Sequence, residues 1–156
     1  MLSDAEIRSL VTKGKLIVSN YREEQLTPNG YDLTAGMIRV PGENGSDGNI
    51  PARSFFLVST LERLDMPSGI AGQIWLKSSF CRKGIIGSFG LVDSGFRGEL
   101  TLALYNAADT AITIFTGRSI AQITFIRMSS EPAQTYEQRS GNYQNQTGVT
   151  TEPARR

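Results

Sequence analysis

Seven short β-rich segments, separated by turn signals, run through most of this 156-residue chain. The segments are rich in β-branched and aromatic residues, and the breaks between them contain Pro-Asn-Gly, Met-Pro-Ser-Gly and similar turn sequences. Many short strands of this kind predict an all-β sandwich, jelly roll or barrel. The expected strands cover residues 15–18, 31–40, 54–64, 70–78, 99–106, 111–117 and 119–128. A turn is expected at residues 41–49.

The two ends of the chain differ from this β-rich middle. Ser3 and Glu6 match a capping box, apolar residues then recur at helical spacing, and Gly14 offers a stop, so one short N-terminal helix is expected. From residue 129 onward the sequence is polar and poor in aliphatic residues. We therefore divide the chain into a β domain at 1–128 and a C-terminal tail at 129–156. By composition the tail is either a solvated, disordered segment or one that becomes ordered when a ligand binds, and Tyr136 and Tyr143 favour the second reading.

Composition excludes several classes of function. Sixteen basic residues balance fifteen acidic ones, so we expect no nucleic-acid partner. No apolar stretch is long enough to span a bilayer and the N-terminus does not resemble a signal peptide, so we expect a cytoplasmic protein without a membrane partner. The chain has no histidine and a single cysteine, Cys81, to which the sequence assigns no role. A zinc cluster and a histidine base are therefore excluded.

Four stretches could carry chemistry. Residues 76–84 place two hydroxyls and three cations at the end of an apolar strand. Such a set of donors and charges suits a polyphosphate, and a solvated strand end explains it equally well. Residues 90–106, GLVDSGFRGELTLALYN, bring Asp93 between apolar residues to a Ser-Gly turn, where we expect a buried carboxylate that acts as a general base or caps the turn. Asp32 in residues 28–36 and Gln122 in residues 117–125 are weaker candidates.

Taken in order, these stretches resemble the superfamily of dUTPases and dCTP deaminases. The segments NGYDL, GLVDSGFRGELTLALYN and GRSIAQITF are similar to dUTPase motifs, whereas the N-terminus, the SSFCR segment and the tail SGNYQNQTGV are closer to the deaminases. The resemblance covers nearly the whole chain. It implies an all-β, distorted jelly-roll (β-clip) fold with a short N-terminal helix, assembled as a homotrimer with shared active sites.

One position favours the dUTPase branch. The deaminase pattern has a catalytic Glu ten residues after the motif Asp, and the count from Asp93 reaches Ala103, which cannot shuttle protons. We therefore expect a dUTP diphosphatase in which Asp93 activates the water that attacks the α-phosphate of dUTP. The alternatives are an enzyme that acts on dCTP, alone or as a bifunctional deaminase and diphosphatase with another residue replacing the Glu, and a nucleotide-binding regulator with little turnover.

The resemblance also implies the substrate contacts. Phe96 would lie against the deoxyribose, and the segment with Gly90, Leu91 and Ala103 would read the base. The triphosphate would carry Mg²⁺, which Asp32 could touch only through water, so no direct metal ligand is expected. The tail would become ordered over the nucleotide. The expected phosphate contacts are Lys77, Ser78, Ser79, Arg82, Gln122, Tyr136 and Gln146. Asn142 departs from the Lys that is common in the deaminase tail.

Overall fold

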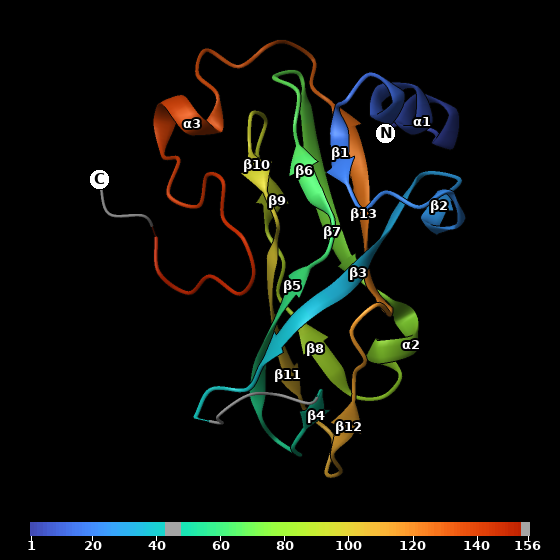
Figure 1. Ribbon diagram of the computed structural model, residues 1–156, viewed down its shortest axis with the longest axis vertical. Coiled ribbons are helices and arrows are strands. Elements are labelled where there is room, and N and C mark those ends of the chain that lie inside the picture. Colours follow the sequence, from blue (N-terminus) through green and yellow to red (C-terminus); the bar gives the residue numbers. More distant parts are fainter. Residues whose placement is uncertain (43–47, 154–156) are drawn as a thin grey trace.

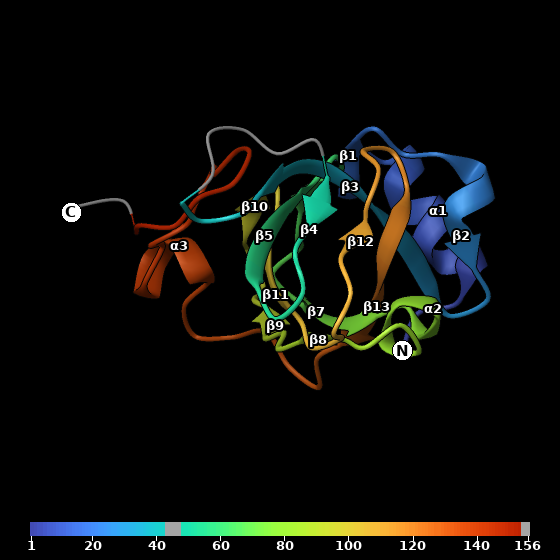
Figure 2. The same cartoon turned by 90° about the horizontal axis from the view of Figure 1, so that it is seen from below.

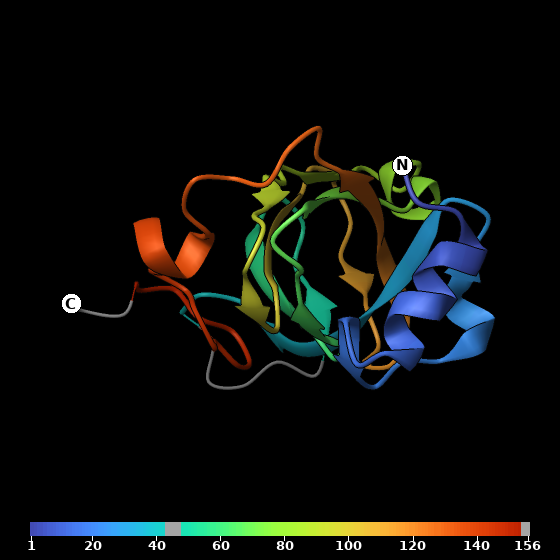
Figure 3. The same cartoon turned by 90° about the horizontal axis from the view of Figure 1, so that it is seen from above.

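The computed structural model describes residues 1–42 and 48–153, which form a curled, mainly antiparallel β structure with three short α-helices among the described residues (Figure 1). Viewed along the long axis, the strands curl around a common interior, with α1 on one side and α3 on the other (Figures 2 and 3). The all-β fold expected from the sequence is confirmed. The expected turn at 41–49 lies in part outside the described residues, as do the last three residues of the tail.

The strands pair in three groups within the described part of the chain. An eight-stranded sheet has the order β8-β11-β5-β3-β13-β7-β9, with β2 also paired to β3, while β1-β6-β10 and β12-β4 form smaller sheets. The helices are α1 (Asp4–Thr12), α2 (Ser78–Cys81) and α3 (Tyr136–Arg139), with a 3-10 turn at Glu23–Gln25. The strands are β1 (Leu16–Ser19), β2 (Leu26–Thr27), β3 (Gly30–Arg39), β4 (Asn49–Ile50), β5 (Phe55–Thr60), β6 (Arg63–Asp65), β7 (Ile70–Leu76), β8 (Ile85–Gly87), β9 (Leu91–Val92), β10 (Arg97–Gly98), β11 (Thr101–Asn106), β12 (Ile112–Thr113) and β13 (Ser119–Arg127).

Helix α1 begins where the capping box predicted. The Ser3 hydroxyl accepts the Glu6 N–H at 3.4 Å, and the Glu6 carboxylate accepts the Ser3 N–H at 3.1 Å, so two otherwise unpaired N–H groups at the helix start are satisfied. Ile7 is fully buried and joins the helix to the core. After the helix, Gly14 has φ of 69°, as expected for a residue that ends a helix.

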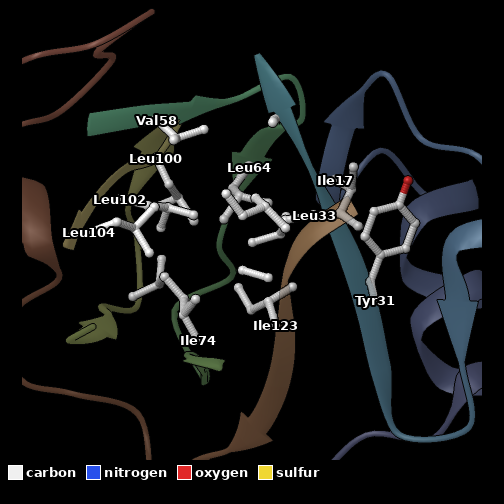
Figure 4. Close-up of a cluster of buried hydrophobic side chains, with 14 of the residues drawn as sticks. Ile17, Tyr31, Leu33, Val58, Leu64, Ile74, Leu100, Leu102, Leu104 and Ile123 are labelled. Carbon is white, nitrogen blue, oxygen red and sulfur yellow. The ribbon is translucent and has the colours of Figure 1, made fainter. Parts of the chain in front are cut away.

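The core lies between the curled sheets. Alternate residues of β5 and β11 point inward, so Phe56, Val58, Leu102 and Leu104 are at most 2% exposed, while their strand neighbours face the other side. Figure 4 shows Val58, Leu102 and Leu104 together with Leu64 and Ile123 from other strands. Burial of such side chains contributes about 1.5–3 kcal/mol each, which makes this interior the main source of stability.

Three expectations from the sequence differ from the structure in local detail. The strand expected at 111–117 is reduced to the two residues of β12. Residues 54–64, expected as one strand, are divided into β5 and β6 by a bend at Leu61 and Glu62. The end of the strand expected at 70–78 turns into α2, because Phe80 N–H and Cys81 N–H both bond the Lys77 carbonyl. Within the described residues, no helix is sufficiently long and apolar to cross a membrane.

Candidate active site

The turn that carries Asp93 is fixed from both sides. Strand β9 pairs with β7 at Val92 and Gly72, and the Phe96 N–H bonds the Asp93 carbonyl at 3.1 Å to close the turn. Met66, just beyond β6, bonds the backbone of Gly95 and Phe96 at 3.1 and 2.9 Å. The Asp93 side chain is exposed, so the expectation of a buried carboxylate was wrong. The turn points the carboxylate outward even though its sequence neighbours are apolar.

The tail packs against this same turn. Gly95 has φ of +81°, and a Cβ atom built on it would lie 2.6 Å from the Thr135 Cβ, so only glycine allows both this backbone and the close approach of the tail. The Tyr136 N–H bonds the Ser94 carbonyl at 2.9 Å. Its ring meets Phe96 edge-on, with centroids 5.7 Å apart, and its hydroxyl accepts the Tyr143 N–H at 2.9 Å.

Beyond Tyr143 the tail runs next to β10 and the start of β11. Gln146 and Gly98 form a parallel bridge, and the Gln146 side-chain amide donates to the Glu99 carbonyl at 2.7 Å. The Glu99 carboxylate accepts the Gly148 N–H at 2.6 Å. The Thr101 hydroxyl accepts the Thr150 N–H at 3.0 Å. The tail is therefore held by backbone and side-chain bonds along its length.

Three neighbouring pockets lie against the tail, two of them next to the Asp93 turn and one over β5 and β11. The first, of about 190 Å³, is lined by Asp93, Phe96, Tyr136, Gln146 and seven further residues. The second, of about 420 Å³, shares Thr101, Tyr143 and Gln146 with it and reaches Ala103. The third, of about 290 Å³, shares Asp93 and Tyr136 with the first and includes Arg139. Of the described side chains that line them, Asp93 is the only carboxylate and Arg139 the only cation.

The expected phosphate contacts divide into two groups. Tyr136 and Gln146 line the first pocket, as do Gly90, Leu91 and Phe96 of the expected base and sugar contacts, whereas Ala103 lines the second. The other expected phosphate contacts, Lys77, Ser78, Ser79, Arg82 and Gln122, line none of the three. Helix α2, which carries two of them, lies at the opposite side of the molecule from α3 (Figures 1 and 2).

The second group has partners of its own. Lys77 forms an ion pair with Asp32 of β3, and the Gln122 amide donates to the Thr27 hydroxyl at 3.0 Å. Ser78, Ser79 and Arg82 are exposed. Among the described residues, no three Asp, Glu, Cys or His side chains gather as a metal-binding cluster. The expected site residues therefore lie in two separate groups on one chain, one with a carboxylate and aromatic rings and one with hydroxyls and cations.

A buried carboxylate lies apart from both groups. Glu62 is fully buried, one of its oxygens accepts the Thr34 N–H at 2.9 Å, and the other has no hydrogen-bond partner. Burial raises the pKa of Glu62, while the bonds from Thr34 and the charge of Arg22 oppose this shift. Burial also raises the pKa of the neighbouring Tyr31 to about 12. Sequence reasoning gave no role to Glu62.

Comparison with known proteins decides the family. A model of the dCTP deaminase-like family matches residues 37–128, which include β5, β7, α2 and the Asp93 turn. The chain belongs to the dCTP deaminase-like family.

Relatives and solved structures agree with this membership. A dCTP deaminase of Pyrococcus horikoshii is 37% identical over 153 residues, covering 94% of this chain and 93% of its own. A "dCTP deaminase, dUMP-forming" of Aquifex aeolicus is 33% identical over a match that covers 96% of this chain and 92% of its own. A dCTP deaminase structure from Agrobacterium tumefaciens has a TM-score of 0.66 and 21% sequence identity, and the match covers 80% of this chain and 46% of that one. The EIAV dUTPase structure has a TM-score of 0.54 and 22% sequence identity, and the match covers 80% of this chain and 93% of that one. The two structures show the fold alone.

The expectation of a dUTP diphosphatase was wrong. It depended on the count from Asp93 to Ala103, one position in one motif, whereas the similarity to proteins named dCTP deaminase extends over more than nine-tenths of the chain. The wider resemblance to the dUTPase and dCTP deaminase superfamily is confirmed. This family is one of enzymes of nucleotide metabolism.

Sequence reasoning missed several side chains that line the pockets. Thr101 lies two residues before Ala103, so the two-residue period of a strand places both on one face, and this signal could have identified it. Tyr143 was noted only as unusual for a solvated tail. Arg139 gave no signal, since a single cation in a polar tail resembles any other.

Proposed function

We propose that the protein is a dCTP deaminase, which converts the cytosine of deoxycytidine triphosphate to uracil and releases ammonia. The observation that carries this proposal is the 37–38% identity, over more than nine-tenths of the chain, to proteins that bear this name. The pocket between the Asp93 turn and the tail supports it, because it combines a carboxylate with aromatic and amide side chains.

The reaction requires several proton transfers. Water must lose a proton as its oxygen bonds to C4, the ring nitrogen N3 must gain one, and the leaving nitrogen must be protonated before the C4–N4 bond breaks. The side chain at 103 is a methyl group and cannot take part. We assign the proton transfers to Asp93, because it is the only carboxylate among the described side chains that line the three pockets.

Binding of the triphosphate requires more positive charge than one chain brings to the pocket. Arg139 is the only cation among the described lining side chains. The exposed set of Ser78, Ser79 and Arg82 provides the hydroxyl and guanidinium donors that a polyphosphate needs, but at the far side of the same chain. We therefore propose a homotrimer in which α2 of a neighbouring subunit completes each pocket.

Magnesium is proposed to arrive on the nucleotide. Asp32 is paired with Lys77, and no cluster of three potential ligands occurs in the described part of the chain, so the donor set fits an ion held by phosphate oxygens. Such an ion would offset phosphate charge. The residues of the chain orient the nucleotide and transfer protons.

A second candidate is an enzyme that also removes pyrophosphate, as the name of the Aquifex aeolicus relative indicates for that protein. The exposed position of Asp93 on a tight turn favours it, because one carboxylate open to solvent can activate water for both steps. The products distinguish the two candidates, since dUTP accumulates in the first and dUMP in the second.

The test follows ammonia and pyrophosphate from dCTP with Mg²⁺, together with the identity of the nucleotide product. We expect ammonia from the unmodified protein and a loss of about 10²–10⁴-fold in Asp93→Asn. Asp109→Asn, which removes an exposed carboxylate paired with Arg53, is the matched control and should keep full activity. Ammonia that appears only after Ala103→Glu, with tight dCTP binding before it, would refute the proposal and indicate a binding protein.

A further inference from the structure

The second pocket extends beyond the space next to Asp93. It has about 420 Å³, against about 190 Å³ for the first, and the two share Thr101, Tyr143 and Gln146. The two pockets are therefore adjacent, and a substituent on a ligand in the first pocket can point toward the second. The additional lining residues are Phe55, Leu57, Ala103, Thr150 and Thr151.

Strand register explains the apolar wall of this pocket. Ala103 of β11 lies opposite Leu57 of β5, and Tyr105 lies opposite Phe55. Because side chains alternate along a strand, these residues share the face that points away from the core. Phe55 remains 46% exposed there, a large aromatic surface with no cover from the core.

Two polar side chains of the same pocket, Thr101 and Gln146, already have partners. The Thr101 hydroxyl accepts the Thr150 N–H and donates to the Gly148 carbonyl at 3.3 Å. The Gln146 amide donates to the Glu99 carbonyl. No charged side chain occurs among the described lining residues. What remains for a ligand is mainly apolar surface from Phe55, Leu57 and the Ala103 methyl group, which a polar or charged substituent would not match.

We propose that this pocket takes an apolar substituent on the pyrimidine ring, so that the protein accepts deoxycytidine triphosphates with an alkyl group at C5. The proposal rests on the proposed function, because it places the base in the first pocket. Ala103 is the residue that determines this specificity. A longer side chain at 103, such as the Glu of the deaminase pattern, would occupy the space and put a carboxylate against Phe55 and Leu57.

The test measures equilibrium binding of dCTP, 5-methyl-dCTP and 5-propynyl-dCTP to the full-length protein with Mg²⁺. Burial of one methyl group should strengthen binding about fourfold. Ala103→Leu fills the pocket, so the preference for 5-methyl-dCTP should vanish and 5-propynyl-dCTP should bind roughly tenfold more weakly than to the unmodified protein. Tyr105→Phe alters the same face outside the pocket lining and should leave all three affinities unchanged.

Failure of this inference and failure of the proposed function give different results. Ammonia from dCTP combined with weaker binding of 5-methyl-dCTP would overturn the inference alone. A preference for 5-methyl-dCTP that Ala103→Leu removes, without ammonia from any nucleotide, would support the pocket and refute the deaminase. An equal effect of Ala103→Leu on all three nucleotides would also overturn the inference, because the residue would then not discriminate at C5.

Discussion

The Tyr136 ring packs edge-on against Phe96, with the two ring planes at 68°. This contact joins the tail to the Asp93 turn, and both rings line the first pocket. The geometry of the pocket therefore depends on Tyr136, which follows Phe96 by forty positions in the sequence.

Replacement of Tyr136 by Leu should weaken dCTP binding more than it weakens the fold. Loss of an aromatic pair costs about 0.5–1.5 kcal/mol beyond area burial, which corresponds to a several-fold rise in KM if the tail closes the pocket. Tyr136→Phe keeps the ring but removes the hydroxyl that accepts the Tyr143 N–H, and it should show a smaller rise. Steady-state kinetics and thermal unfolding measure the two effects, and equal KM values for both variants would contradict this expectation.

Asp93→Asn should separate chemistry from binding. The amide has the size of the carboxylate but cannot accept a proton from water, so kcat should fall about 10²–10⁴-fold while Kd for dCTP changes only a few-fold. Rapid-quench and calorimetric measurements give the two constants. A large rise in Kd with little change in kcat would mean that Asp93 holds the nucleotide and does not transfer protons.

Thr60 is a positioning residue for the wall of the first pocket. It is buried, its hydroxyl donates to the Glu62 carbonyl at 3.0 Å and accepts the Leu100 N–H at 2.9 Å, and Leu100 lines that pocket. Thr60→Val leaves the buried Leu100 N–H unpaired and should reduce the free energy of unfolding by about 1–3 kcal/mol in urea denaturation. Thr60→Ser keeps the hydroxyl, so it should recover most of the lost free energy of unfolding. Its KM for dCTP should also return to that of the unmodified protein. A Ser variant as damaged as the Val variant would show that the methyl group matters instead.

Glu62 should make stability depend on pH in a defined direction. Burial raises the pKa of the Glu62 carboxyl in the folded state above its value in the unfolded chain. The stability that this shift contributes is therefore fully present below the ordinary Glu pKa of about 4.3, and it is lost as pH rises through the pKa of the folded state. Glu62→Gln removes the titration, so the variant should gain stability relative to the unmodified protein as pH rises through the range above the ordinary Glu pKa. Thermal unfolding across this range measures the difference, with the exposed Glu152→Gln as control. A constant difference at every pH would show that Glu62 stays ionised.

Elements with a strong local pattern could be predicted from the sequence. The α1 capping box and the long strands β3, β7 and β13 were expected within one or two residues of their observed bounds, because their hydrophobic pattern extends over several side chains. Strands β2, β4, β9 and β10 have two residues each, and two residues show no period. They exist because a partner strand pairs with them, as Asp65 of β6 does with Arg97 of β10.

The candidate site was predictable only in part, for a related reason. Asp93, Phe96, Tyr136 and Gln146 all line the first pocket, and each belongs to a motif that can be recognised in isolation. Ser78 and Arg82 are recognisable in the same way, yet no local pattern shows that α2, which carries Ser78, lies at the opposite side of the molecule from α3. The choice of branch failed because a single side chain, Ala103, outweighed the similarity of the whole sequence.

The parallel bridge between Gln146 and Gly98 has a consequence beyond the pocket. The tail pairs with the backbone of Arg97 and Glu99, which would otherwise present unpaired N–H and C=O groups at an open sheet edge. Open edges recruit strands from other molecules and promote aggregation. Removal of the tail, by proteolysis or by an early stop codon, would therefore affect the solubility of the protein as well as its activity.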